Sequence, residues 1–186
     1  MTKGSLNERI SMDKFPYSGI VLTHSYNAAV TDSASSATAY STGFKTNNGA
    51  LGLDQDLNEL ENLTETIDKF GFVSSLISTS EVTHATPAAF AAHIDLRWKT
   101  DIISSQMIDS RVATILGGGR YFFTPEEESG KREDGRNLLD EIKESHILLI
   151  EKNQLSEISN SLDKQVLGLF ADEHLRYKDK KDNHYL

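Results

Sequence analysis

An acid and a hydroxyl stand side by side at Asp32 and Ser33, between an apolar run and a run of small residues. Residues 19–23 are mostly apolar and β-branched, and residues 34–39 are only Ala, Ser and Thr. This order predicts a strand, a short connection and a helix that begins at Ser33. The N–H groups and dipole at a helix N-terminus favour negative charge, which suits a serine that becomes an alkoxide and then carries a phosphate.

The same pair has a plainer interpretation, because clusters of Ser, Asp and Thr are most often helix caps and turns. The sequence contains neither a G-x-S-x-G elbow nor a G-x-x-x-x-G-K-[ST] loop. Two common arrangements for nucleophiles and phosphates are therefore not indicated. The pattern alone leaves a nucleophile and a helix cap both open.

A second set of polar side chains follows a second apolar run. Residues 72–78 have the composition of a strand, Thr86 comes soon after them, and Arg97 lies eleven residues beyond Thr86. Functional residues of parallel sheets gather at the carboxyl ends of the strands, so we expect Ser33 and Thr86 to meet at one edge. The fork of a guanidinium can bind two phosphate oxygens at once. The plainer role of Arg97 is that of a solvated surface residue.

Strand and helix patterns alternate along most of the chain. The predicted strands are residues 17–23, 72–78, 112–116, 147–150 and 165–171, and the predicted helices are residues 34–42, 60–70, 88–93, 102–110, 137–144 and 154–158. The run at 72–77 is apolar without alternation, which is typical of a strand covered on both faces. The order favours an α/β layered domain with a mainly parallel central sheet flanked by helices.

Composition excludes several classes of protein. The chain has 186 residues, a net charge of −9 and no cysteine. Disulfides and cysteine metal sites are therefore excluded, and the acidic balance argues against a nucleic-acid-binding protein. No run is long and apolar enough for a membrane segment, and residues 1–14 lack an apolar signal core. The compartment stays open.

Two long blocks resemble the alkaline phosphatases. Residues 30–52, VTDSASSATAYSTGFKTNNGALG, resemble that family's active-site segment, in which V-x-D-S precedes small residues and Thr. Residues 78–97, STSEVTHATPAAFAAHIDLR, resemble its second active-site segment, in the family's order and at a similar separation. Weaker similarity extends over residues 115–125 and 168–174. Residues 1–186 are thus identified as a partial alkaline phosphatase domain.

The resemblance implies an enzyme that hydrolyses phosphate monoesters through a phosphoserine, with the help of zinc and magnesium ions. Ser33 matches the nucleophile, which is also a zinc ligand, and Arg97 matches the residue that binds the phosphate. Asp32 matches the acid that orients this arginine, although it can also cap the helix. Thr86 matches a hydroxyl ligand of magnesium. His84 stands where family members have Asp or His near magnesium; its plainer interpretation is a loop histidine without a role.

Other family motifs have no match in this sequence. The D-G-M-G segment does not precede Ser33, and the later E-G, D-x-x-x-H and D-H segments do not follow Arg97. An inactive fragment, or a non-catalytic phosphatase-like domain without the metal sites, is therefore an alternative. Hydrolysis of diesters or sulfate esters is a third possibility, which the two specific blocks disfavour. Homodimers and periplasmic or secreted locations are common in the family and enter here only by resemblance.

The remaining histidines lie outside these blocks or match no ligand within them. We expect His24 and His93 to be structural. His174 and His184 are ten residues apart in a charged tail, which is not a spacing typical of a metal site.

Overall fold

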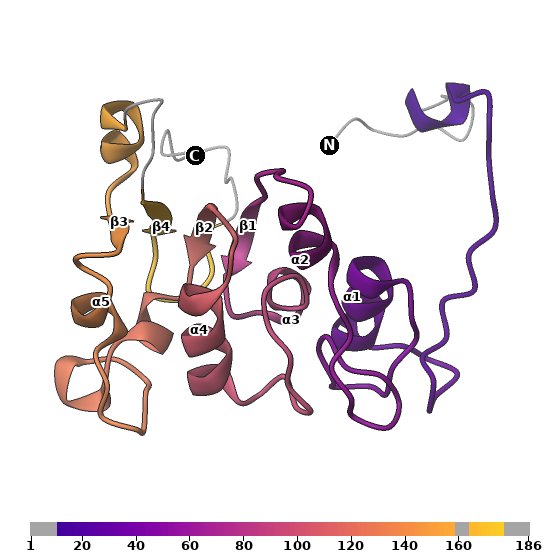
Figure 1. Ribbon diagram of the computed structural model, residues 1–186, viewed down its shortest axis with the longest axis horizontal. Coiled ribbons are helices and arrows are strands. Elements are labelled where there is room, and N and C mark those ends of the chain that lie inside the picture. Colours follow the sequence, from indigo (N-terminus) through magenta and orange to yellow (C-terminus); the bar gives the residue numbers. More distant parts are fainter. Residues whose placement is uncertain (1–10, 159–163, 177–186) are drawn as a thin grey trace.

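The computed structural model describes residues 11–158 and 164–176 of the chain. Its centre is a sheet of four parallel strands (Figure 1). The strands lie in the order β1 (Ser75–Glu81), β2 (Thr114–Gly118), β4 (Gln165–Leu169) and β3 (His146–Leu149). The prediction of a mainly parallel sheet is confirmed.

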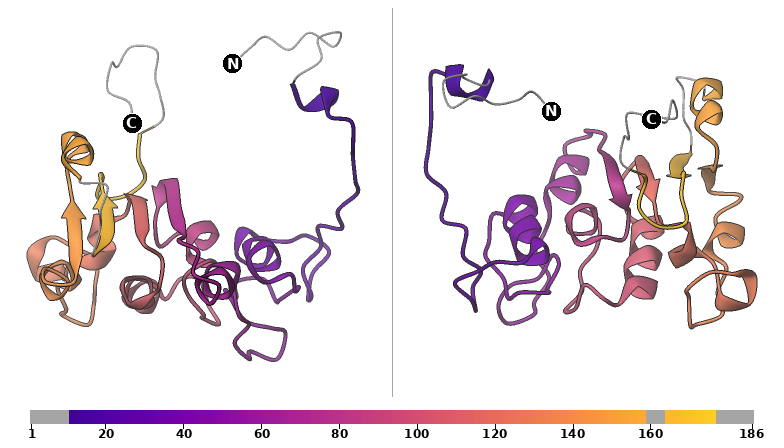
Figure 2. Two further views of the ribbon diagram at one scale, coloured as in Figure 1. Left: turned by 45° about the horizontal axis from the view of Figure 1, so that its top comes forward. Right: turned by 180° about the vertical axis from the view of Figure 1, so that it is seen from behind.

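Helices lie beside this sheet in a row. They are α1 (Ser33–Thr42), α2 (Leu63–Asp68), α3 (Ala85–Ala88), α4 (Thr100–Asp109) and α5 (Leu138–Glu141), with 3₁₀ turns at Ser11–Lys14, Arg120–Phe123, Glu126–Glu128 and Lys152–Glu157. Figures 1 and 2 show α5, α4, α3 and α1 following one another along the same side of the molecule. The α/β layered class is confirmed. No helix in the described ranges has both the length and the apolar character that crossing a membrane requires.

The N-terminal helix α1 has clear local signals at both ends. Asp32 is its N-cap and accepts a hydrogen bond from the backbone of Ser35, and Gly43 ends it with a φ of 81°. This left-handed conformation is the one that glycine adopts without a steric penalty. The prediction of a helix over residues 34–42 is confirmed, with Ser33 as its first residue.

Small side chains bring α1 and α3 together. Ala34 and Ala37 on α1, and Ala85 and Ala88 on α3, are at most 2% exposed. Alanine adds little bulk between the two backbones, so the first turn of α1 lies beside α3. The contact belongs to one continuous apolar core that also contains Ile115 of β2 and Leu167 of β4.

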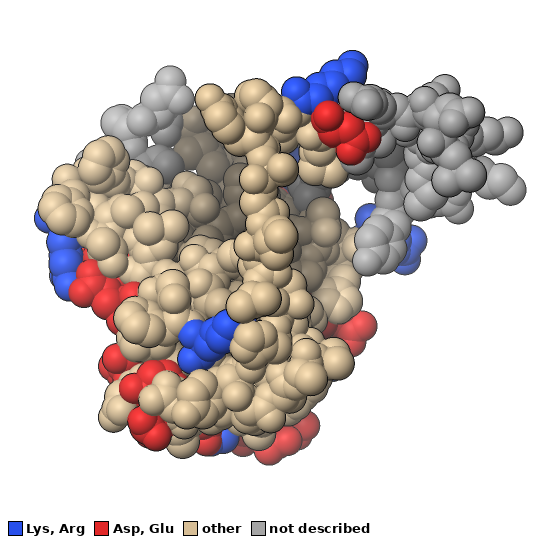
Figure 3. Space-filling model, turned by 90° about the vertical axis from the view of Figure 1, so that its right-hand side faces the viewer, with Lys and Arg blue, Asp and Glu red and all other residues tan. Residues whose placement is uncertain are grey.

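The predicted strand at residues 17–23 is wrong. These residues pair with no strand of the described sheet, and they run as an arm away from the helices (Figure 1). Tyr17 is 90% exposed and Ile20 is 95% exposed. Figure 3 looks at the side that carries the arm and shows a column of largely uncharged surface. A β-branched, apolar composition suits a pleated surface but does not supply the partner strand that satisfies the backbone.

The strand predicted at 72–78 forms three residues later, as β1, and it is not covered on both faces. It is an edge strand within the described sheet, and the side chain of Ile77 is 74% exposed. The expectation of two covered faces fits β4 instead, where Val166 and Leu167 are both buried. Both strands have apolar composition, which does not distinguish an edge position from a central one.

Several helices have different bounds from those predicted. The helices expected over residues 102–110 and 137–144 are α4 and the shorter α5, and the one expected over residues 154–158 is the 3₁₀ turn at Lys152–Glu157. The helix expected over residues 60–70 is the shorter α2, after which Gly71 takes a φ of 77°. The helix expected over residues 88–93 lies earlier, as α3. Pro87 falls inside the first turn of α3, where its missing N–H has no intrahelical partner to lose.

Candidate active site

Arg97 brings the polar residues of the two blocks together. Its Nη1 donates a hydrogen bond to Ser33 Oγ over 2.5 Å and lies 3.5 Å from Asp32 Oδ2. Its Nη2 lies 3.1 Å from His84 Nε2. The arginine side chain is 10% exposed, and its guanidinium carbon lies 4.9 Å from the centre of the Trp98 ring. It is therefore a largely buried cation next to a hydroxyl, and not a solvated surface residue.

Asp32 both caps the helix and faces the arginine. One carboxylate oxygen accepts hydrogen bonds from the backbone N and Oγ of Ser35, at 2.9 and 3.0 Å, and the other accepts from the backbone of Gly49 at 3.1 Å. Partial burial raises the pKa of Asp32, but these hydrogen bonds and the charge of Arg97 outweigh it, so the pKa is lowered. Asp32 is therefore an anion at neutral pH, held by the helix and by the loop at Gly49 together.

Asn48 is a structural neighbour of the nucleophile candidate to which the sequence assigned no individual role. Its Oδ1 accepts hydrogen bonds from the backbone N of Asp32 at 3.1 Å and from Ser35 Oγ at 2.9 Å. Its Nδ2 donates to the Val30 carbonyl at 3.0 Å. This side chain fixes the turn into α1. Asn48 lies within the matching block at residues 30–52, but the resemblance assigned it no role of its own.

His84 is the N-cap residue of α3 and points at the arginine. A guanidinium only donates hydrogen bonds, so His84 Nε2 carries a lone pair and the ring is neutral. Burial lowers the pKa of His84, and the charges of Arg97 and His174 lower it further. His84 is therefore a neutral imidazole whose Nε2 lone pair is directed into the site.

His174 lies beside His84, although its place in the sequence indicated no role. The two ring centres are 5.7 Å apart in an edge-on arrangement, and His174 Nδ1 accepts a hydrogen bond from the backbone of Glu81 at 3.0 Å. The contact joins the segment after β4 to the end of β1. About ninety residues separate the two histidines, so no spacing rule pointed to it.

Thr86 and Ser33 line one surface cavity of about 350 Å³. The other lining residues are Thr31, Asp32, Ser36, Ala37 and Tyr40. The predicted meeting of Ser33 and Thr86 is present, but the packing of α1 on α3 produces it instead of two strand ends. The cavity leaves room for a group bonded to the Ser33 oxygen.

The described residues do not make up a zinc site. Within residues 11–158 and 164–176, no three His, Cys, Asp or Glu side chains are grouped so that they could hold a metal ion. A catalytic zinc ion normally has about three protein ligands. Ser33 and Thr86 offer hydroxyls, and the lone pair of His84 is directed at Arg97.

Known proteins are similar to this chain in sequence and in fold. Residues 2–185 match the family model described as Alkaline phosphatase. Alkaline phosphatase 4 of Bacillus subtilis is 36% identical over 164 residues, which are 83% of this chain and 33% of that protein. The structure of alkaline phosphatase from the Antarctic bacterium TAB5 has 32% identity and a TM-score of 0.74, over 83% of this chain and 44% of that one.

A variant of the TAB5 enzyme, in which a histidine is replaced by glutamate, was solved with magnesium bound in its M3 site. It has 32% identity and a TM-score of 0.75, over 83% of this chain and 43% of its own. The chain spans about a third of the length of the curated relatives it matches. The match to the family model nonetheless extends over nearly the whole sequence. The chain therefore belongs to the alkaline phosphatase family.

Proposed function

We propose that this chain carries the nucleophile and the phosphate-binding arginine of a phosphate monoester hydrolase. The observation that supports it best is the 2.5 Å contact between Arg97 Nη1 and Ser33 Oγ, at the open cavity next to Thr86. A cation that touches the hydroxyl oxygen favours its alkoxide form, and so does the N-terminus of the ten-residue helix α1. Asp32 keeps the arginine directed at this oxygen.

The reaction consists of two displacements at phosphorus. In the first, a bond forms between Ser33 Oγ and phosphorus, the Ser33 O–H bond and the ester P–O bond break, and the leaving oxygen takes up a proton and departs as the alcohol. In the second, the oxygen of a water molecule bonds to phosphorus, the bond to Ser33 breaks, and Ser33 regains a proton from that water as inorganic phosphate is released. Arg97 holds two non-bridging oxygens with its fork throughout both steps.

Zinc and magnesium belong to the proposal as the cofactors that the family implies. When bound, such ions stabilise an alkoxide or a leaving oxygen. The ligand candidates in this chain are Ser33 for zinc, Thr86 for magnesium, and His84 beside magnesium. They are too few for the zinc site, so the remaining ligands have to come from elsewhere. Residues 1–186 are proposed as part of one alkaline phosphatase domain. A homodimer and a periplasmic or secreted location are proposed on family grounds.

A non-catalytic role is the second candidate, and the ligand count favours it. A domain that binds an oxyanion through Arg97 and the start of α1, without hydrolysing an ester, needs no zinc ligands. The described residues contain the arginine and the helix terminus but no three-ligand metal group. The two candidates differ in whether phosphate is transferred to Ser33.

Turnover of p-nitrophenyl phosphate with added Zn²⁺ and Mg²⁺ tests the two candidates. We would measure it for the 186-residue chain and for a chimera in which this chain replaces the matching third of the Bacillus subtilis relative. The chimera is expected to hydrolyse the ester, because its host supplies the remaining two thirds of an alkaline phosphatase, and the chain alone is expected to be far slower. A folded chimera that binds both metals but neither turns over nor becomes labelled would favour the non-catalytic role.

Arg97→Lys in the chimera should weaken inhibition by inorganic phosphate. A lysine places one point charge where the guanidinium offers a two-pronged fork. The expected loss is about 1–3 kcal/mol, the range for a hydrogen bond to a charged group. Arg136→Lys, a change at an exposed arginine that pairs with Glu141, is the matched control. Equal inhibition constants for Arg97→Lys and the control would contradict the assignment of Arg97.

A further inference from the structure

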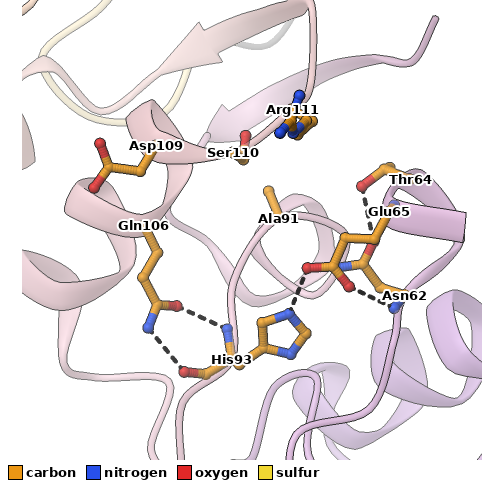
Figure 4. A pocket seen from close by; sticks show the side chains of 9 residues that line it. All are labelled: Asn62, Thr64, Glu65, Ala91, His93, Gln106, Asp109, Ser110 and Arg111. Atoms are coloured by element: carbon orange, nitrogen blue, oxygen red, sulfur yellow. Dashed lines mark hydrogen bonds and ion pairs between the residues drawn. The ribbon is translucent and has the colours of Figure 1, made fainter. Parts of the chain in front are cut away.

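His93, which the sequence led us to expect as a structural residue, bridges two elements beside the site. Its Nδ1 lies 2.8 Å from the carbonyl oxygen of Gly52. Its Nε2 lies 2.8 Å from Glu65 Oε1 on α2, a contact that Figure 4 shows. Both partners are hydrogen-bond acceptors, so both ring nitrogens carry a proton and the ring is a cation.

The surroundings of the ring favour this cation. Burial lowers the pKa of His93, but the hydrogen bonds to Gly52 and Glu65 and the charges of Glu65 and Glu59 outweigh it, so the pKa is raised above 6.5. Two adjoining cavities contact the ring. The further charged residues that line them are Asp109 and Arg111 in one cavity and Glu61, Asp68, Lys69 and Arg111 in the other. Lys69 pairs with Glu61, and Arg111 pairs with Asp68. The net charge of the side chains around the ring is therefore negative.

The backbone of His93 is fixed from the other side. Its N–H donates to Gln106 Oε1 at 2.7 Å, and its carbonyl accepts from Gln106 Nε2 at 3.0 Å. This pair anchors the residue to α4, while the ring reaches across to α2 (Figure 4). A change in the ring contacts therefore moves the Gly52 loop relative to an anchored residue.

The contact between His93 and Gly52 is the first of a series of hydrogen bonds that joins residues 49–52 to residues 93–97 and ends at Arg97. We call this series the ladder. The next residues, Leu51 and Ile94, exchange two backbone hydrogen bonds of 2.8 and 2.9 Å, and then the Arg97 N–H donates to the Gly49 carbonyl at 2.8 Å. The Gly49 N–H in turn donates to Asp32 Oδ2 at 3.1 Å. The position of the loop at residues 49–52 thus sets where both the arginine and its acid lie.

We propose that His93 is a positioning residue for Arg97: as a cation it ties the Gly52 loop to α2 and thereby holds the guanidinium against Ser33. The proposal rests on the proposed function in that Arg97 is taken to bind phosphate. When the ring loses its second proton, Nδ1–H still reaches Gly52, but the Nε2 lone pair faces the Glu65 carboxylate. The bridge to α2 then opens, and the ladder that carries Arg97 loosens.

The stabilisation that His93 supplies should decrease as the pH rises. Because the folded pKa of His93 is raised, the stabilisation by the bridge is fully present below 6.5 and is lost as the pH rises through the folded pKa. Binding of an oxyanion at Arg97 should weaken over the same range. Sulfate is the suitable probe, because its charge stays constant there, whereas inorganic phosphate itself titrates.

Glu65→Gln removes the negative charge of the carboxylate but keeps a side chain of the same length that can still form a hydrogen bond with His93. A glutamine at position 65 can keep the capping box, in which Asn62 N–H donates to the side chain of residue 65. Its amide can also donate to the Nε2 lone pair of a neutral His93. In this variant the bridge no longer needs the second proton, and its pH dependence in this range should disappear. Glu61→Gln, which removes a nearby charge that pairs with Lys69 and does not contact His93, is the matched control.

The experiment uses the full 186-residue chain between about pH 5.5 and about pH 9, on both sides of the ordinary histidine pKa. We would follow the His93 Cε1–H resonance, assigned by its absence in His93→Gln, together with hydrogen exchange at the Arg97 and Ile94 amides and the Kd for sulfate. In the wild type and in Glu61→Gln, His93 should titrate above 6.5. Across that titration, amide protection should fall and the sulfate Kd should rise about threefold to tenfold, the effect of one hydrogen bond.

In Glu65→Gln the histidine should titrate lower, and protection of the Arg97 amide should not follow pH over that range. Two results would overturn the proposal. One is a wild-type His93 that titrates at or below the ordinary value, and the other is the same pH dependence in Glu65→Gln as in Glu61→Gln. Neither measurement needs turnover, so a chimera that fails to hydrolyse p-nitrophenyl phosphate would reject the proposed function and leave the role of His93 to be decided separately.

Discussion

We expect Ser33→Ala to abolish the proposed covalent phosphoenzyme and to lower the turnover of the chimera by a factor on the order of 10⁴ or more, the effect of removing a catalytic nucleophile. The alanine leaves Arg97 and the start of α1 in place, so an oxyanion still binds. It removes the Ser33 oxygen, which lies 2.5 Å from Arg97 Nη1 at the cavity and which we propose as the nucleophile. The expected pattern is therefore lost chemistry with retained phosphate inhibition.

The measurement is acid trapping of labelled phosphate on the metal-loaded chimera, followed by identification of the labelled peptide. Ser36→Ala is the matched control, since Ser36 lines the same cavity on the same helix and contacts Thr31 at 3.1 Å. We expect the control to keep both label and turnover. Undiminished label on Ser33→Ala, or label that disappears only in Ser36→Ala, would assign the nucleophile to another oxygen.

Local signals predicted the helix at the site better than they predicted the sheet. The Asp32 cap, the small residues and Gly43 all act within one helix length, so α1 could be placed from the sequence almost to the residue. The strand expected at residues 17–23 needed a distant partner, which a local pattern cannot specify. The same limitation explains why β1 appeared to be a covered strand although it lies at an edge of the described sheet.

Long-range contacts of the site could be predicted only where a motif reported them. The resemblance placed Arg97 with Ser33, and the two side chains do lie in contact. No motif related His93 to Glu65, or His84 to His174, and both contacts depend on how separate elements pack. From the sequence, His93 therefore appeared structural and His174 had no indicated role, although His174 lies beside His84 and His93 contacts Gly52 at the start of the ladder.

The glycine at position 52 is the point where this positioning is most sensitive. Gly52 has a φ of 62°, and a Cβ added there would lie 2.5 Å from His93 Nδ1 and 2.6 Å from the Ala92 carbonyl oxygen. The left-handed conformation costs a non-glycine residue about 1–2 kcal/mol. Crowding in a packed region adds about 1–3 kcal/mol. Gly52→Ala is therefore expected to lower the free energy of unfolding by about 2–5 kcal/mol.

Gly43→Ala separates the two contributions, because Gly43 has a φ of 81° but no atom within 4 Å of the place that a Cβ would take. It should show only the cost of the backbone conformation, about 1–2 kcal/mol. Urea unfolding of both variants gives the difference, and the sulfate Kd shows whether the crowding also reaches Arg97. Since the new methyl group pushes against His93, only Gly52→Ala should weaken sulfate binding. The two variants could instead have equal free energies of unfolding and unchanged sulfate binding. In that case the loop would adapt to the methyl group without moving Arg97, and the close contact between Gly52 and His93 would have no part in positioning the arginine.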